Sequence, residues 1–260
     1  MSVKDYGYDP GKLGEYTEEL IKLLRLKATP TAIKLYKKKE DMLMVPKIRT
    51  PKEGEILTAC QMLGQATRLN FTVGFTVSSL PGVQCAGICG LAQKETHLNS
   101  THLTGVWFET DEDSLHHQNT MFCLEENYEA IAATPLGSGR VGDPDVCLVY
   151  GTPQQIMFLC CGYQYEDYEM MESSFVSETS CTDSWVRAIV TQKPCFTIPC
   201  FGERRFGGVL EEELVFAFPP RFITKILAGI RKLSKNGLRY PASYYGIQQD
   251  VRAGLSVSYK

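Results

Sequence analysis

The chain has 260 residues, of which 43% are hydrophobic and 22% are charged, and its formal net charge is −3. This length and composition predict a globular protein with a buried core, in one large domain or two small ones. The small negative charge argues against nucleic acid or an anionic membrane as a partner. No apolar run reaches the ~18–20 residues of a membrane-spanning helix, and the polar start lacks a secretion signal, so we expect a cytoplasmic protein.

The first half of the chain is predicted to alternate between helices and strands. Apolar spacing and strand-like alternation identify the regular elements. We expect helices over residues 12–27, 57–70 and 114–132, and strands over 31–36 and 71–77. Charge, proline and glycine predict loops over 37–55 and 78–91, and no element is assigned to 97–113.

The second half repeats this alternation. A loop is expected over 137–145, because glycine and proline punctuate it. Strands are expected over 146–151, 195–200 and 214–218, and helices over 153–165, 180–193 and 219–235. The mixed order of elements predicts an α/β or α+β fold with a mixed sheet flanked by helices, in a single domain spanning 1–260.

Two parts of the sequence echo each other. In each part a cysteine lies just inside a predicted helix start, the helix leads into a strand, and a second cysteine follows beside glycine. The first pair is Cys60 and Cys85, and the second is Cys181 and Cys200. This pattern suggests two pseudo-symmetric halves, 28–135 and 136–235, with these cysteines near their junction.

Ten cysteines are unusual for a chain expected in a reducing compartment, where disulfides are rare. Four of them lie inside apolar segments and are expected to be small core residues. These four are Cys123, Cys147, Cys160 and Cys161.

The helix-start cysteines have a chemical reason to differ from core residues. Thr58 to Gln61 carries the capping-box pattern, and Ser180 to Asp183 carries a close variant. Cys60 and Cys181 then fall in a first helical turn, where unpaired N–H groups and the helix dipole favour a thiolate. A thiolate both attacks electrophiles and binds metals.

Four thiolates from separate elements could form a tetrahedral sulfur site. Cys60, Cys85, Cys181 and Cys200 are the predicted ligands of an iron–sulfur cluster, with zinc as the alternative. Cys85 and Cys200 are expected in glycine-containing loops. Gly202 and Arg204 are the predicted cofactor-binding residues, with Arg204 offsetting the negative charge. No C-x-x-C pair is present, so structural burial of all ten cysteines stays open.

The combination of motifs resembles a known family. Its pieces in this chain are PTAIKLY, ACQMLGQA, QCAGICGLA, PDVCLVYGTPQQ, SETSCTDSW, IPCFGERRFGG and EELVFAFPP. Together they resemble the uncharacterised prokaryotic family catalogued as domain of unknown function 169, from about Tyr16 to Leu233. The resemblance implies an origin in anaerobic bacteria or archaea. By this resemblance, the cysteines that recur in the family correspond to the four predicted ligands. The roles of Cys89 and Cys195 stay undefined. The resemblance implies no reaction.

Three functions remain open from the sequence. The first is a cluster- or metal-binding protein that serves redox or electron-transfer chemistry in anaerobic metabolism. The second is a metal-free enzyme with Cys60 or Cys181 as nucleophile. The third is a binding or assembly subunit whose cysteines are structural. The partners considered are a redox partner protein and a second copy of the chain.

Overall fold

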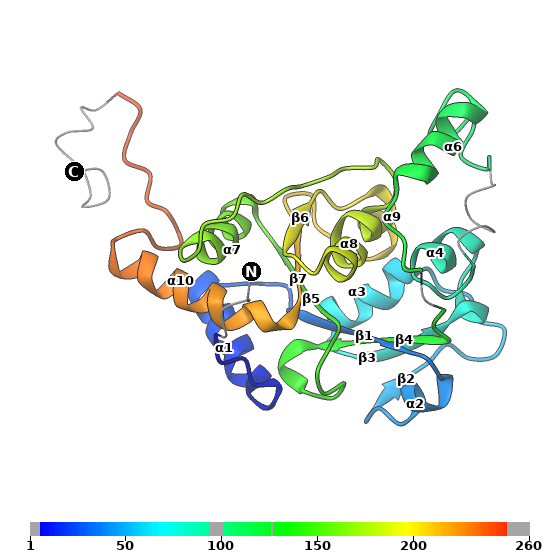
Figure 1. Ribbon diagram of the computed structural model, residues 1–260, viewed down its shortest axis with the longest axis horizontal. Helices are drawn as coiled ribbons and strands as arrows, with labels where there is room; N and C mark the ends of the chain where they lie inside the picture. The colour runs from blue at the N-terminus through cyan, green and yellow to red at the C-terminus, as the bar shows by residue number, and fades with distance from the viewer. Residues whose placement is uncertain (1–5, 94–100, 126, 249–260) are drawn as a thin grey trace.

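The computed structural model describes residues 6–93, 101–125 and 127–248, and it shows a mixed seven-stranded sheet with helices on both faces (Figure 1). The strand order is β2-β3-β4-β1-β5-β7-β6. The strands are β1 (Thr31–Tyr36), β2 (Ile48–Arg49), β3 (Thr72–Thr76), β4 (Ala130–Pro135), β5 (Val146–Gly151), β6 (Cys195–Thr197) and β7 (Leu214–Phe218). The predicted α/β class is therefore confirmed.

The sheet is built outward from the antiparallel pair of β1 and β5. Ile33 of β1 lies opposite Val146 of β5 and, on its other side, opposite Ala133 of β4. Moving outward, β4 and then β3 follow on one side, and β7 and then β6 follow on the other, all antiparallel. Only β2 runs parallel to its neighbour. The two halves thus place their strands in matching order, although the duplication itself stays a prediction.

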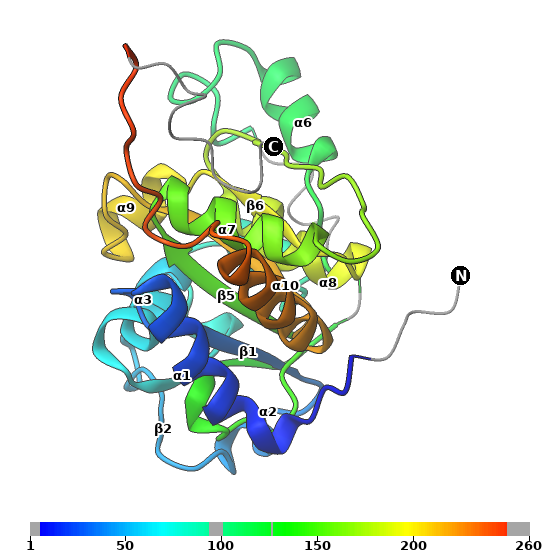
Figure 2. The same cartoon turned by 90° about the vertical axis from the view of Figure 1, so that its left-hand side faces the viewer.

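Alternation along the strands feeds two separate cores. In β1, Ile33 and Leu35 face one core, whereas Ala32 faces the other. The core that contains Ala32 is covered by α1 (Leu13–Leu24), α7 (Pro153–Gln164) and α10 (Ile223–Lys235), which lie together in Figure 2.

The opposite core is covered by the helices that carry the predicted site. These are α3 (Ala59–Leu69), α4 (Val83–Ile88), the π-helix η4 (Thr182–Val186), which continues into α8 (Arg187–Thr191), and α9 (Phe201–Phe206). Figure 1 shows α3, α4, α8 and α9 on the same side of the sheet. The sheet therefore separates the helical layer of α1, α7 and α10 from the layer that carries the four predicted ligands.

Two predicted elements were wrong. The expected loop 37–55 contains α2 (Lys39–Leu43) and β2. The expected helix 114–132 is α6 (Asp111–Thr120), followed by a separate strand, β4. Alanine favours helices, but the alanine-rich β4 is buried between β3 and β1, and this tertiary pairing outweighs local propensity.

The unassigned stretch 97–113 is only partly described. Residues 97–100 lie outside the described residues, and Thr104 and Phe108 form a single parallel bridge. Within the described parts of the chain, no helix combines the length and the apolar character needed to cross a bilayer.

Candidate thiol site

Cys60 is positioned by a well-formed helix start. Thr58 Oγ1 accepts a hydrogen bond from the Gln61 backbone N–H at 3.1 Å, and Gln61 Oε1 accepts one from the Thr58 N–H at 2.9 Å. The predicted capping box is therefore confirmed. It fixes the first turn of α3 and places Cys60 at its second residue, where the side chain is buried.

The second predicted cap is wrong, although Cys181 does lie in a first helical turn. Ser180 Oγ donates to Glu203 Oε2 at 2.7 Å and accepts from the Cys200 backbone N–H at 3.0 Å. Asp183 instead accepts from the Val176 backbone N–H at 2.8 Å. The side chains that would close the box are thus used to join this helix to other segments.

The two expected cysteine loops are helical. Cys85 lies in α4, and Cys200 is the N-cap residue of α9. Glycine in these stretches suggested loops, but here it permits close packing. A Cβ atom on Gly64 of α3 would lie 2.4 Å from the backbone oxygen of Gly207, so α3 and α9 approach more closely than side chains would allow.

The structure brings the predicted ligands together. The thiols of Cys181 and Cys200 lie near enough to the Cys60 thiol to raise its pKa. Cys85 lies close enough for the charges of Cys181 and Cys200 to act on it, and burial raises its pKa to about 12. Gly202 borders the group, because a Cβ atom there would lie 3.5 Å from Cys60 Sγ and 3.7 Å from Cys200 Sγ. We call Cys60, Cys85, Cys181 and Cys200 the thiol site.

The sulfurs are packed against one another rather than spread around a ready cavity. Over residues 6–93, 101–125 and 127–248, no group of three or more His, Cys, Asp or Glu side chains is arranged to hold a metal ion. A bound ion would have to replace the interactions of the Cys60 thiol with Cys181 and Cys200. The residue types and their convergence fit a soft metal, and the missing side chain of Gly202 leaves space beside two of the sulfurs.

The thiols of the site differ in acidity. The Cys60 hydrogen bond, supported by Ser180 and by backbone N–H groups, lowers the pKa of Cys200 to about 5. The contacts with Cys181 and Cys200, together with burial, raise the pKa of Cys60 well above its ordinary value. Helix-start position favoured a thiolate at Cys60 and Cys181, whereas the pKa is lowered at Cys200 and raised at Cys60.

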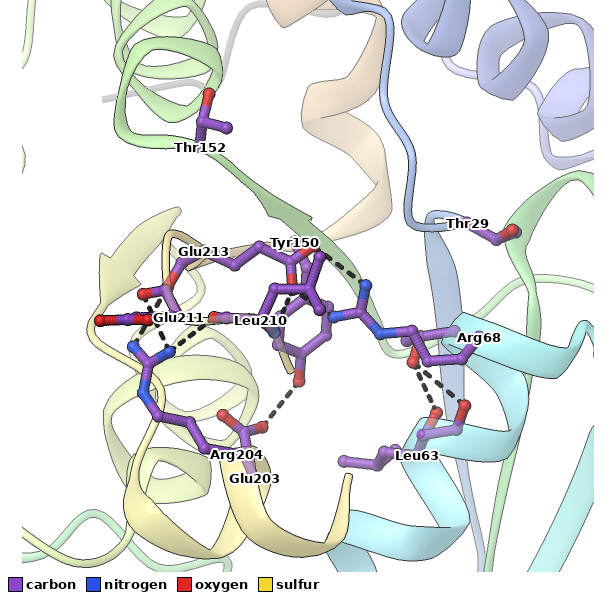
Figure 3. Close-up of polar contacts among 12 residues, drawn as sticks. Thr29, Leu63, Arg68, Tyr150, Thr152, Glu203, Arg204, Leu210, Glu211 and Glu213 are labelled. Atoms are coloured by element: carbon purple, nitrogen blue, oxygen red, sulfur yellow. Dashed lines mark hydrogen bonds and ion pairs between the residues drawn. The ribbon is translucent and has the colours of Figure 1, made fainter. Parts of the chain in front are cut away.

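A buried carboxyl group lies beside the site and was missed from the sequence. Glu203 is 1% exposed and accepts hydrogen bonds from the Tyr150 hydroxyl at 2.6 Å (Figure 3) and from Ser180 Oγ at 2.7 Å. Burial, and then the charge of Cys200, raise the pKa of Glu203 to about 7. Its position three residues after Cys200 in the CFGER segment was the available signal.

Arg204 points away from the sulfurs. Its Nε donates to the Pro199 oxygen at 3.2 Å, and its Nη1 donates to the Leu210 oxygen at 2.6 Å and the Glu211 oxygen at 3.1 Å (Figure 3). The guanidinium group therefore braces the chain on both sides of α9. Its predicted charge-balancing role stays a prediction.

A second arginine ties α3 to the same segment. Arg68 forms a two-point ion pair with Glu213, with Nη1–Oε1 and Nη2–Oε2 distances of 2.9 and 2.5 Å. Its guanidinium carbon lies 5.5 Å from the ring centroid of Tyr150. The helices that carry Cys60 and Cys200 are thus linked by charge as well as by glycine packing.

The other cysteines fall into two groups. Cys89, which the sequence left undefined, is buried near Cys85 and Cys181, whereas the Cys195 thiol donates to the Ser184 backbone oxygen at 3.3 Å. Of the four expected core cysteines, Cys123 is buried near Cys89 in the same core, Cys147 is buried in the opposite core, and Cys160 and Cys161 are half-buried.

Comparison with known proteins gives a family without an assigned activity. A family model described as domain of unknown function 169, uncharacterised ArCR, matches residues 19–229. An uncharacterised protein of Methanocaldococcus jannaschii is 24% identical over 231 residues, covering 85% of this chain and 95% of the relative. No solved structure matches the chain.

Proposed function

Because the chain belongs to the uncharacterised family of domain of unknown function 169, whose relatives bring no activity, we propose from its own geometry that it holds a thiolate-bound metal centre. The ligands are Cys60, Cys85, Cys181 and Cys200. The observation that carries this proposal is the contact of Cys60 with Cys181 and Cys200, which come from three different helices. The centre would be an iron–sulfur cluster, or zinc, in a cytoplasmic protein of anaerobic metabolism.

The proximity of the sulfurs to one another supports a thiolate-bound ion. In a tetrahedral site with Zn–S bonds of about 2.3 Å, neighbouring sulfurs lie about 3.8 Å apart, which is close to ordinary sulfur–sulfur contact. A cluster would supply electron transfer to a redox partner when bound.

The protein's own residues would set the charge of the centre. Glu203 is held by Tyr150 and Ser180, and its raised pKa keeps a proton on this carboxyl group near neutral pH. Ser180 also fixes the backbone of Cys200. These contacts orient the Cys200 sulfur and reduce the negative charge that gathers around four thiolates.

Metal content after purification without oxygen tests the proposal. We expect bound iron with acid-labile sulfide and a broad absorption band near ~400 nm, or colourless protein with bound zinc. Cys60→Ser and Cys181→Ser are expected to lose most of the metal, because each removes a ligand. Cys161→Ser is the matched control, since Cys161 is half-buried on α7, across the sheet.

Two results would contradict the metal centre. One is a metal content below about one atom per ten chains in the unmodified protein. The other is equal metal content in Cys60→Ser and Cys161→Ser, which would place any bound metal elsewhere.

A second candidate function is metal-free nucleophilic catalysis, and the contact between Cys60 and Cys200 favours it. The sequence pointed to Cys60 or Cys181 as nucleophile, whereas the lowered pKa of Cys200 beside Cys60 favours Cys200. Such a thiolate would attack an electrophilic carbon at neutral pH, forming an S–C bond as a leaving group departs.

The rate of alkylation separates this candidate from the metal centre. With iodoacetamide, we expect one thiol, Cys200, to react with a pH profile whose midpoint lies near the pKa of about 5. Cys60→Ala should move this midpoint upward, because the hydrogen-bond donor is lost. If no thiol titrates below pH ~8, Cys200 is not a thiolate and the candidate fails.

A further inference from the structure

A small cavity lies on the far side of the helix that carries Cys181. It has a volume of about 100 Å³ and lies between the end of α7, the segment 169–172 and the start of β6. Arg187 lines it, six residues after Cys181, or about 9 Å further along the helix axis. The cavity is therefore distinct from the thiol site.

Arg187 is a buried cation that pairs directly with Glu172. Its charge also acts on the buried carboxyl group of Asp183, which it reaches through Ser174. Its side chain is 11% exposed, whereas that of Glu172, with which it forms an ion pair, is 74% exposed. The pair uses a single nitrogen, Nη2, at 3.3 Å. An arginine in a protein site commonly binds a carboxylate through two parallel hydrogen bonds, so this pairing is weak for a buried guanidinium.

The guanidinium is fixed in place by other contacts. Its Nη1 donates to Ser174 Oγ at 2.6 Å, and its carbon lies 5.2 Å from the ring centroid of Phe122. Glu172 can therefore swing into solvent without releasing Arg187. A cation held in advance binds an anion with little loss of side-chain entropy.

The remaining charges favour an anion in this cavity. Lys193 also lines it and pairs with Glu169, which accepts a second hydrogen bond from the Tyr163 hydroxyl at 2.8 Å. Lys225 lies 4.3 Å from the ring centroid of Tyr163. Once Glu172 turns outward, Arg187 and Lys193 face only the carboxylate of Glu169 among the lining charges.

We propose that this cavity binds the carboxylate group of a small anionic metabolite. Arg187 is the residue that mainly binds this carboxylate, and the Glu172 side chain occupies the same position on Arg187 when no metabolite is bound. The carboxylate of Glu172 identifies the chemistry, because it already pairs with Arg187. A volume of about 100 Å³ corresponds to about three water molecules at ~30 Å³ each, so the ligand is a short-chain mono- or dicarboxylate.

Calorimetric titration of the full chain with malonate, and separately with phosphate, tests this site. We expect malonate to bind with a dissociation constant in the ~1 mM range. Glu172→Gln should bind malonate about tenfold more tightly, because it removes the carboxylate that competes with malonate and keeps the guanidinium group of Arg187. Arg187→Lys should bind it about tenfold more weakly, because lysine keeps the charge but loses the two-point geometry.

Arg231→Gln is the matched control, since Arg231 pairs with Glu19 on the opposite helical layer and is expected to leave malonate binding unchanged. Glu172 is exposed, so its substitution tests the site even if Arg187→Lys fails to fold. The proposal is overturned if Glu172→Gln binds malonate no better than the unmodified protein. Phosphate binding without malonate binding would overturn the assignment of a carboxylate.

Discussion

At the scale of single residues, the protonation of Glu203 makes the stability of the folded protein depend on pH. Its carboxyl group is enclosed by Tyr150 and Ser180, and its pKa is raised from 4.5 to about 7. Between these values the folded protein holds a proton that the unfolded chain has released. The stabilisation from this group is complete below pH 4.5 and is lost as the pH rises through 7.

Comparison of Glu203→Gln with the unmodified protein exposes this effect. The unmodified protein and the variant should differ in how their free energies of unfolding depend on pH. As the pH rises from ~4.5 to ~7, the unmodified protein should lose about 1–3 kcal/mol of stability relative to the variant. Urea denaturation under reducing, oxygen-free conditions at several pH values measures it. Glu211→Gln, at an exposed position, should show a pH-independent difference. A constant difference for Glu203→Gln would mean that Glu203 is ionised throughout.

The sequence could identify the sulfurs but not their chemical states. Cys60, Cys85, Cys181 and Cys200 were selectable because two helix starts and two glycine-flanked positions recur along the chain. The thiolate on Cys200 depends on a donor 140 positions away in sequence, and no local pattern contains that contact. Glu203 was missed because a charged residue is usually solvated, and only tertiary packing encloses it.

At the scale of elements, the contact between α3 and α9 brings two of the sulfurs together. The contact depends on the absence of side chains at Gly64 and Gly207. Gly64→Ala should lower the free energy of unfolding by about 1–3 kcal/mol, because its Cβ would lie 2.4 Å from a backbone oxygen that cannot rotate away. Thermal or urea denaturation measures this loss.

Gly14→Ala on α1 is the control of the same type. Its Cβ would lie 3.4 Å from the nearest heavy atom, the backbone oxygen of Gly137, so the substitution should be neutral or stabilise the helix by up to ~1 kcal/mol. If Gly64→Ala were as stable as Gly14→Ala, α3 and α9 would not require the glycine contact.

Elements with strong periodicity were predicted well, whereas short ones were not. The local sequence pattern was sufficient to predict the helices with apolar stripes, α1, α3 and α10, and the strands with buried apolar runs, β5 and β7. The helices α4 and α9 have six residues each, too few to stand alone, and packing against neighbours stabilises them. Their glycines therefore suggested loops.

At the scale of the whole molecule, the sheet explains why distant cysteines meet. With β1 and β5 at the centre, α3, which leads into β3, and the helix η4–α8, which leads into β6, lie on one face of the sheet and bring Cys60 and Cys181 together (Figure 1). The sequence suggested two related halves from the spacing of the cysteines. It could not give the strand order, because β1 pairs with β4, about 100 residues later, and such long-range pairing leaves no local trace.

The origin of the four sulfurs has a consequence for synthesis. Cys60 and Cys85 leave the ribosome within the first 90 residues, whereas Cys181 and Cys200 follow only after residue 180. Because chains emerge from the N-terminus, a nascent chain carries half of the thiols without their counterparts. Any group held by all four can be loaded only after Cys200 has been synthesised, so products truncated before Cys200 cannot sequester it.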